Sequence, residues 1–286
     1  MKRSFTRFVG VDLGGGRGKT TALAEIRSGA LGAEVIEVAT RSGKLAWTDD
    51  TLLARLGAAD PARAIAIDAP LTAPACTRCV EPVCPGTEAC VDPAVVWLRT
   101  TGRALVQELA EQTINGRGHG GRSGRTTTTT TAMPQARLAP YQHRATEVVM
   151  TYERGLLPPS ALGASNAAIA ARAGQLKKRL AGAGYALHDN LLEVSPAATI
   201  ARLCGPRAAR GYKRDADPWR TRALILEQLG DLTFAPQSRM AREDVLSNDH
   251  CFDALIAAYT AYRWAHDGWE RPSGVFEQDG WIVAPP

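Results

Sequence analysis

The chain has 286 residues, of which 45% are hydrophobic and 22% charged, and its 34 Lys and Arg against 29 Asp and Glu give a net charge of +5. These fractions are typical of a folded protein and exclude a disordered or fibrous chain, and no apolar run reaches the roughly 18 residues that a membrane span needs. The basic N-terminus is followed by an Asp and a glycine run instead of a signal-peptide core, so we expect a cytoplasmic protein with no membrane partner.

The first 70 residues predict a β-β-β-α-β order. Three apolar runs joined by glycine-rich turns are typical of an antiparallel meander. Thr48, followed by Asp49 and Asp50, is a good start for a helix. The next strand is short, of the buried type, and ends at Asp68. The predicted strands are residues 5–13, 19–26, 33–39 and 64–67, and the predicted helix is residues 52–56.

Two irregular segments follow within what we expect to be one domain, residues 1–286. Residues 74–93 form a cysteine-rich loop, and Pro93 is a suitable first residue for a helix that continues to about residue 112. Residues 113–146, with several glycines and six consecutive threonines, predict a basic, mobile insertion. The later elements are helices at residues 167–181, 197–203, 219–229 and 249–266, a strand at 191–194 and a short strand or extended cap at 280–285.

The glycine run near the N-terminus does not form a P-loop. That loop requires a glycine five residues before the glycine of its Gly-Lys-Thr triplet, and Leu13 stands there. The segment after Lys19 also reads as a strand, whereas a P-loop is followed by a helix. A tight hairpin, in which glycine permits positive φ, accounts for the run.

Acidic residues occur at or next to the ends of apolar elements. They are Asp12, Asp68, Glu193 and Asp253. Each has a structural explanation, such as capping a turn, but Asp253 lies in an apolar helix where an unpaired carboxylate is costly. If all four converge, they cannot ionise together without a cation. Hard oxygen ligands suit Mg²⁺ or Mn²⁺, which activate water for attack on phosphate esters.

Two further polar residues share the helix of Asp253. Asp249 lies one turn earlier on the same face, and His250 lies three residues earlier. Asp249 is also a good helix N-cap, so it is a secondary candidate for the site.

Several motifs, taken in order, resemble one family. They are Phe-Val-Gly-Val-Asp at 8–12, Ala-Ile-Asp-Ala-Pro-Leu at 66–71, Glu-Val-Ser-Pro-Ala-Ala at 193–198 and His-Cys-Phe-Asp-Ala-Leu-Ile-Ala-Ala at 250–258. With Asp-Gly-Trp-Ile at 279–282, they resemble the predicted-nuclease family of the ribonuclease H-like superfamily known as domain of unknown function 429. The resemblance implies an α/β fold with a mixed five-stranded sheet of order 3-2-1-4-5 and helices on both faces.

The resemblance also implies a catalytic site. Asp12, Asp68, Glu193 and Asp253 would meet at one metal site, with Asp12 bridging two metal ions. His250 and Asp253 are similar to the His/Asp pair of Holliday-junction resolvases, so His250 would assist a metal ion or the attacking water.

A further motif of that family is similar to Arg-Ala-Thr-Glu at residues 144–147. Two readings of its arginine remain open. Arg144 could face a substrate phosphate, or it could form an ion pair with Glu147.

The cysteine-rich loop predicts a second metal site. Four thiols within 15 residues suit tetrahedral zinc or a 4Fe-4S iron–sulfur cluster, and without an export signal disulfides are not expected. Free thiols are the third possibility. The cysteines are Cys76, Cys79, Cys84 and Cys90, with the spacing C-x2-C-x4-C-x5-C.

The insertion at residues 113–146 has the composition of a nucleic-acid contact. It contains no Asp or Glu up to residue 146, and arginine with small polar residues on a glycine-rich loop is suited to phosphates. A solvated insertion without function is the alternative. The candidate residues are Arg117, Arg122, Arg125, Arg137 and Arg144.

Three functions are compatible with these features. The first is a divalent-metal-dependent nuclease acting on RNA, DNA or a hybrid. The second is a catalytically inactive nucleic-acid-binding or scaffold protein of the same fold, in which Asp12 and Asp253 would lie too far apart to share a metal. The third is a phosphotransferase of the actin or sugar-kinase type, because Asp-Leu-Gly-Gly at 12–15 followed by Lys19 resembles the first phosphate hairpin of that class.

Overall fold

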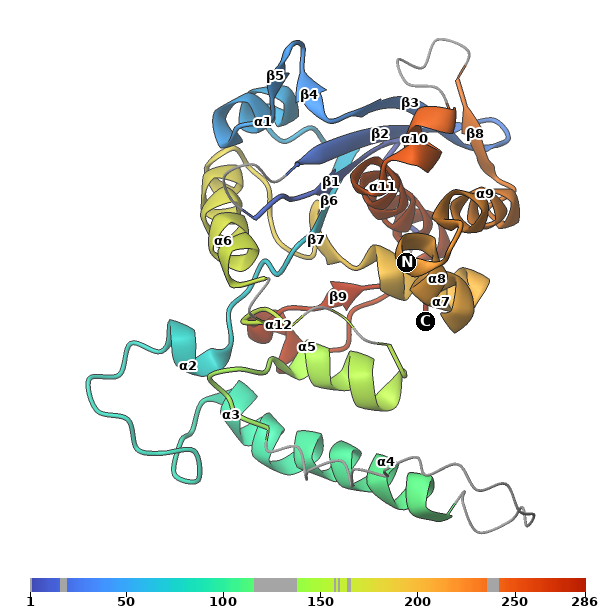
Figure 1. Ribbon diagram of the computed structural model, residues 1–286. Helices are drawn as coiled ribbons and strands as arrows, with labels where there is room; N and C mark the ends of the chain where they lie inside the picture. The colour runs from blue at the N-terminus through green and yellow to red at the C-terminus, as the bar shows by residue number, and fades with distance from the viewer. Residues whose placement is uncertain are drawn as a thin grey trace, which may run out of the picture.

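Strand β1 (Arg7–Asp12) lies at the centre of a seven-stranded sheet in the described part of the computed structural model (Figure 1). The order is β8-β3-β2-β1-β6-β7-β9. β1 pairs antiparallel with β2 and β2 antiparallel with β3, whereas the other pairs are parallel. The structure describes residues 2–15, 20–115, 138–156, 158, 160–163, 166–235 and 242–286.

The bounds of the elements follow the chain. The remaining strands are β2 (Ala22–Gly29), β3 (Gly32–Ala39), β4 (Arg41–Ser42), β5 (Leu45–Ala46), β6 (Arg63–Asp68), β7 (Leu191–Val194), β8 (Leu232–Phe234) and β9 (Ile282–Val283). The helices are α1 (Asp49–Leu56), α2 (Ala75–Arg78), α3 (Pro93–Trp97), α4 (Arg103–Asn115), α5 (Ala145–Val148), α6 (Ala167–Gly182), α7 (Pro196–Cys204), α8 (Pro206–Arg214), α9 (Pro218–Gln228), α10 (Arg242–Ser247), α11 (Asp249–Asp267) and α12 (Phe276–Asp279). Two π-helical segments, η1 (Leu98–Gly102) and η2 (Val149–Glu153), continue α3 and α5.

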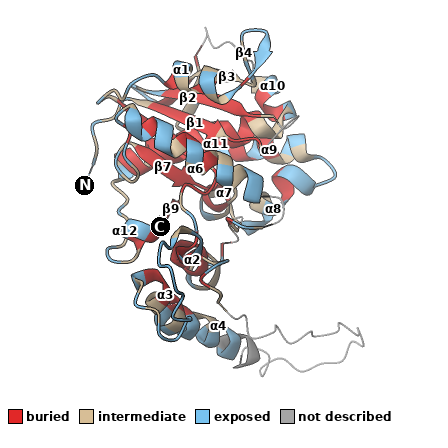
Figure 2. Cartoon of the chain, turned by 90° about the vertical axis from the view of Figure 1, so that its left-hand side faces the viewer, coloured by how far each residue is buried: buried red, intermediate tan, exposed pale blue. Residues whose placement is uncertain are grey.

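Side chains of the central strands alternate between two hydrophobic cores on opposite faces of the sheet. Phe8 and Ala66 belong to the core that contains α11, whereas Val9 and Ile67 belong to the core that contains α1 and α6. Figure 2 shows the strands as a buried layer with partly exposed helices over it. In β1 and β6, even-numbered residues therefore face the core that contains α11, and odd-numbered residues face the core that contains α1 and α6.

Helix α11 packs very closely on β1 because the contact is made by small residues. A Cβ atom added at Gly10 would lie 2.1 Å from the carbonyl oxygen of Ala254 and 2.3 Å from the amide nitrogen of Ala258. Asn248 caps the start of α11, and Gly268 ends it with a left-handed backbone conformation. This close contact fixes the first turns of α11 beside the end of β1.

Helices α2 to α4 and the cysteine-rich loop extend away from the sheet (Figure 1). Few of their residues are buried; Ala75, Ala94 and Val95 form a small separate cluster at the base of the loop. Residues 79–89 are exposed throughout.

The prediction of a mixed α/β fold is confirmed, but the sheet has two more strands than the five implied. β8 has three residues, too few to give an alternating pattern that a sequence can reveal, whereas β9 lies in the tail at residues 280–285, where a short strand is one of the two predicted forms. The predicted insertion is also shorter at both ends, because Thr113 lies in α4 and Ala145 begins α5. Residues 116–137 lie outside the described residues.

Among the described helices, none is both long and apolar enough to cross a membrane.

Candidate metal centre

Two aspartates end adjacent parallel strands on the same face of the sheet. Asp12 is the last residue of β1 and Asp68 the last residue of β6, and the two are partners in the strand register. Asp12 follows Gly10 by two residues, and Asp68 follows Ala66 by two. Because side chains alternate between the two faces along a strand, both aspartates belong to the face that α11 covers. The side chain of Asp12 is 13% exposed, and Asp68 is half-buried.

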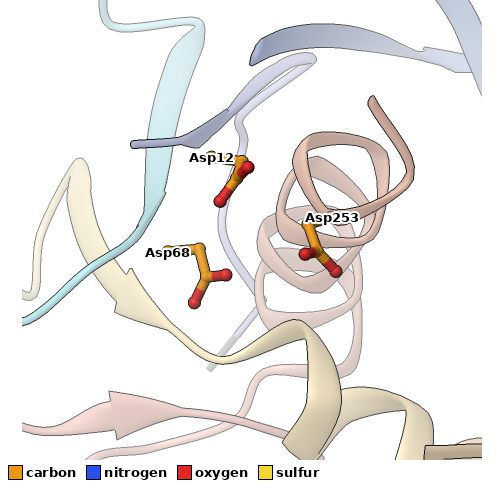
Figure 3. Close-up of side chains that lie close together, drawn as sticks. All are labelled: Asp12, Asp68 and Asp253. Atoms are coloured by element: carbon orange, nitrogen blue, oxygen red, sulfur yellow. The ribbon is translucent and has the colours of Figure 1, made fainter. Parts of the chain in front are cut away.

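Asp253 completes the cluster from α11. Its side chain is 1% exposed, and it lies on the helix beside the two strand aspartates (Figure 3). One carboxylate oxygen from each of Asp12, Asp68 and Asp253 lies within 4.8 Å of the others. Within the described part of the chain, these three residues form the group whose donor atoms are close enough to share one cation.

The charges of neighbouring carboxylates oppose the ionisation of Asp68 and Asp253. Burial, followed by the charges of Asp253 and Asp12, raises the pKa of Asp68 well above its usual range. Burial raises the pKa of Asp253 to about 6, although Lys213 acts in the opposite direction. A divalent cation would relieve this repulsion, and oxygen donors of this kind are the ligands that Mg²⁺ and Mn²⁺ prefer.

Two residues of α8 neutralise Asp253 and were missed by the sequence interpretation. Lys213 forms an ion pair with Oδ2 of Asp253, and the Tyr212 hydroxyl donates to Oδ1 at 2.9 Å. The proximity of Asp253 raises the pKa of Lys213 against the effect of burial. No helix is predicted from the sequence over Pro206–Arg214, although Gly205 and Pro206 are a signal for the start of one.

His250 contacts the cluster from the first turn of α11. Its Nδ1 lies 2.6 Å from Oδ2 of Asp12, and this hydrogen bond is the main cause of its raised pKa. The imidazole is 39% exposed and lines a cavity of about 320 Å³ together with Asp12, Asp68 and Lys213. Asp249 begins α11, half-buried, and its charge also raises the pKa of His250.

Glu193 does not join the three aspartates, which departs from the expectation of one four-carboxylate site. In β7 its register partner is Ile67, a residue of the opposite face, so its side chain begins on the side away from α11. Both carboxylate oxygens are engaged by Arg144, at 2.7 and 2.9 Å, and Oε2 also accepts the amide of Leu71 at 2.8 Å. Glu193 therefore holds the turn that follows Asp68.

Arg144 is completely buried, so the reading in which it faces a substrate phosphate is wrong. It forms ion pairs with both Glu147 and Glu193, and it donates to the Thr72 hydroxyl at 2.8 Å. Glu147 in turn accepts the Arg144 amide at 3.2 Å. The arginine lies within a protein network with no surface left for a nucleic acid.

The same network joins the C-terminal motif to the turn after Asp68. Asp279 accepts the amide of Ala145 at 2.5 Å, and its own carbonyl accepts the Thr72 hydroxyl at 2.7 Å. The Thr146 hydroxyl accepts the amide of Ile282 at 2.9 Å. The motifs at residues 144–147, 193–198 and 279–282 are distant in the sequence, yet each contacts the turn that follows Asp68.

Five other predicted residues fall where the structure gives no description of the chain. Lys19, Arg117, Arg122, Arg125 and Arg137 lie outside the described residues. The loop cysteines make no disulfide, and three of their thiols are exposed; the four do not form a group with all sulfur atoms within 4.8 Å.

A family model described as "Protein of unknown function (DUF429)" matches residues 10–275. No curated protein and no solved structure matches the chain.

Proposed function

The chain belongs to the DUF429 family, and on this premise we propose that it is a divalent-metal-dependent nuclease that hydrolyses phosphodiester bonds of nucleic acid. The observation that carries the proposal is the approach of donor oxygens of Asp12, Asp68 and Asp253 to within 4.8 Å of one another, where Asp12 and Asp68 line a cavity. Three converging carboxylates suit a chemistry in which a cation is held against a phosphate.

The donor set fits Mg²⁺ or Mn²⁺. All three side chains offer hard oxygens, and the raised pKa values of Asp68 and Asp253 mean that full ionisation of the cluster is unfavourable without added positive charge. When bound, the metal would supply a Lewis acid that activates water and stabilises the leaving oxygen.

The neighbouring side chains have roles that follow from their contacts. His250, whose imidazole lines the cavity, donates from Nδ1 to Asp12, which leaves its Nε2 to hold or transfer a proton. Lys213, which faces the same cavity, is suited to a phosphate oxygen once a metal replaces it as the counter-charge of Asp253. Arg144 and Glu193 act as positioning residues through the turn after Asp68.

The strand order supports the same proposal. Within the sheet, β3-β2-β1-β6-β7 run consecutively, with an antiparallel meander first, as in the ribonuclease H-like order 3-2-1-4-5.

The alternatives have less support. The scaffold reading expects Asp12 and Asp253 to be too far apart for a shared metal, and their donor atoms lie within 4.8 Å. The phosphotransferase alternative depends on Lys19, which lies outside the described residues. It also requires a second Asp-Gly-Gly hairpin, but Asp68 is followed by Ala69 and Pro70 instead of glycines.

The decisive experiment is a cleavage assay with Mg²⁺ or Mn²⁺ on single-stranded, duplex, hybrid and branched nucleic acids. We expect wild-type cleavage to be abolished by EDTA and reduced at least ~10²-fold in Asp12→Asn and in Asp253→Asn, in line with the loss of several kcal/mol of transition-state stabilisation. Asp50→Asn, an equally small change at a residue whose side chain is 82% exposed on α1, serves as the control.

Two outcomes would contradict the nuclease proposal. Cleavage that persists unchanged in both variants would assign the activity to another site or to a contaminant. Tight, salt-dependent binding without cleavage of any substrate by the wild type would favour the scaffold reading.

A further inference from the structure

The cysteine-rich loop has no hydrophobic core of its own. Residues 79–89 are exposed without exception, and even Val80 and Val83 are 91% and 78% exposed. Between Cys79 and Cys90, the backbone makes one turn hydrogen bond, from the amide of Cys90 to the carbonyl of Gly86 at 3.0 Å. Neither apolar burial nor backbone pairing therefore accounts for an ordered loop of this length.

The two ends of the loop are nevertheless brought together. Cys90 packs against the small cluster of Ala75, Ala94 and Val95, so it lies beside the helix that carries Cys76. The amide of Cys76 is fixed by a hydrogen bond to the carbonyl of Pro140 at 3.1 Å. Cys76 and Cys90, the first and last of the four cysteines, therefore both lie at the base of the loop.

One arginine holds the second half of the loop. Nη1 of Arg99 donates to the carbonyl oxygens of Thr87, Glu88 and Cys90 at 2.8, 2.6 and 2.9 Å. Asp92 then caps the following helix through the amides of Ala94 and Val95. This anchoring leaves Cys79 and Cys84 on the free arc of the loop, where both residues are exposed.

We propose that this loop closes around one structural zinc ion, with Cys76, Cys79, Cys84 and Cys90 as its four ligands. Four cysteine thiolates give the closed tetrahedral shell of a structural zinc site. The sulfur atoms are not yet all within 4.8 Å of one another, and the arc with Cys79 and Cys84 folds inward when the ion binds. The site is independent of the nuclease proposal, because no aspartate of the carboxylate cluster contributes to it.

Zinc is favoured over an iron–sulfur cluster by the surroundings of the thiols. An iron–sulfur cluster depends on its protein shell, which controls solvent access and potential. Here the valines nearest to the cysteines in sequence, Val80, Val83 and Val91, are 91%, 78% and 88% exposed and provide no such shell. Zinc has no redox chemistry, so exposure to solvent does not compromise it.

The first test is the metal content of the full-length protein, purified without chelator. We expect one zinc per chain by elemental analysis, lost in Cys79→Ser/Cys84→Ser, a double variant at two exposed positions. The matched control is Cys204→Ser, a half-buried cysteine of α7 outside the loop, which should keep its zinc.

A second measurement needs no variant. Wild-type protein reconstituted with Co²⁺ should show thiolate-to-cobalt charge-transfer absorption and the intense visible bands of a tetrahedral site. A glutamate-specific protease should cut after Glu81 and Glu88 only when zinc is removed, because the loaded loop is held closed.

The proposal is overturned by four free thiols and no zinc, or by iron with sulfide and broad visible absorption. It is also overturned if zinc is retained in Cys79→Ser/Cys84→Ser but lost in Asp12→Asn, because the metal would then belong to the carboxylate cluster. Loss of nuclease activity alone has no bearing on it.

Discussion

One step of strand register gives Asp68 and Glu193 different roles. Both stand near the carboxyl ends of adjacent parallel strands, β6 and β7, where functional side chains often gather. Register pairs Glu193 with Ile67 instead of Asp68, so Glu193 belongs to the opposite face and is taken up by Arg144. The three aspartates are left close together, and burial with neighbouring negative charge raises the pKa values of Asp68 and Asp253.

The first prediction is that Asp68→Asn stabilises the protein in EDTA at pH 7.5, by roughly 1–3 kcal/mol, because it removes one of three opposed charges. In the wild type the pKa values of Asp68 and Asp253 are raised on folding, so the folded state binds protons more tightly than the unfolded state. The free energy of unfolding therefore falls as pH rises from about 4 to above 6, and the gain in Asp68→Asn should be smaller at pH 5.

Thermal unfolding at both pH values measures this effect, with Asp50→Asn as the control. Addition of Mg²⁺ at pH 7.5 should raise the wild-type midpoint and leave Asp68→Asn little changed. A wild type that is as stable as Asp68→Asn in EDTA would show that the carboxylates are not in conflict.

The second prediction concerns the buried arginine. Arg144→Gln should destabilise the fold by roughly 3–5 kcal/mol, because Glu147 and Glu193 are then left buried without their counter-charge. Urea unfolding measures the change, and Arg220→Gln, on an exposed residue of α9, should stay within about 0.5 kcal/mol. If Arg144→Gln costs less than the control, the network is not a structural support.

At the scale of elements, the site depends on how closely α11 lies on β1. Gly10 has no Cβ, and the alanines of α11 that face it are small, so the helix backbone touches the strand. Because Asp12 follows Gly10 by two residues and Asp253 precedes Ala254, this contact sets the spacing between two of the three carboxylates.

The third prediction is that Gly10→Ala destabilises the protein by about 2–3 kcal/mol and weakens Mg²⁺ binding, because α11 must move away from the strand. The matched control is Gly174→Ala in α6, where an added Cβ meets nothing within 4 Å. That change should stabilise by about 0.4–1 kcal/mol through helix propensity and the unfolded state. Isothermal titration calorimetry measures Mg²⁺ affinity, and urea unfolding measures stability. If Gly10→Ala and Gly174→Ala behaved alike in both measurements, close packing of α11 on β1 would not explain the site.

At the scale of the whole molecule, acidic and basic residues of interest belong to different segments of the sequence. The acidic cluster lies at the strand ends, whereas the arginines of the insertion at residues 113–146 lie mostly outside the described residues. A nuclease has to hold a polyanion beside carboxylates, so basic residues away from the cluster are expected to supply the affinity.

The fourth prediction is that replacing Arg117, Arg122, Arg125 and Arg137 together by Gln weakens nucleic-acid binding and lowers its dependence on salt. The slope of log affinity against log salt should decrease by roughly 0.7–0.9 for every phosphate that these arginines neutralise in the wild type. Fluorescence anisotropy over a salt series measures the slope, and an unchanged unfolding midpoint serves as the control. An unaltered slope would assign phosphate binding to other residues.

The sequence by itself determined much of the local structure. Strands ending at Asp12 and Asp68, the helix beginning at Asp249 and the strand at residues 191–194 follow from apolar runs, caps and turn residues, which act over a few neighbours. The order of the motifs was sufficient for the family. The apolar surroundings of Asp253 marked it as costly to bury without a partner, and this was the best local sign of a site.

Only the tertiary structure decided which charges face one another. Register assigned Glu193 and Arg144 to a buried clamp, and the packing of α8 against α11 brought Lys213 and Tyr212 to Asp253. The short edge strands β8 and β9 likewise form only because neighbouring strands offer their backbone groups. These outcomes depend on contacts between segments far apart in the chain, and a local pattern of residue types carries no information about which face or partner such contacts select.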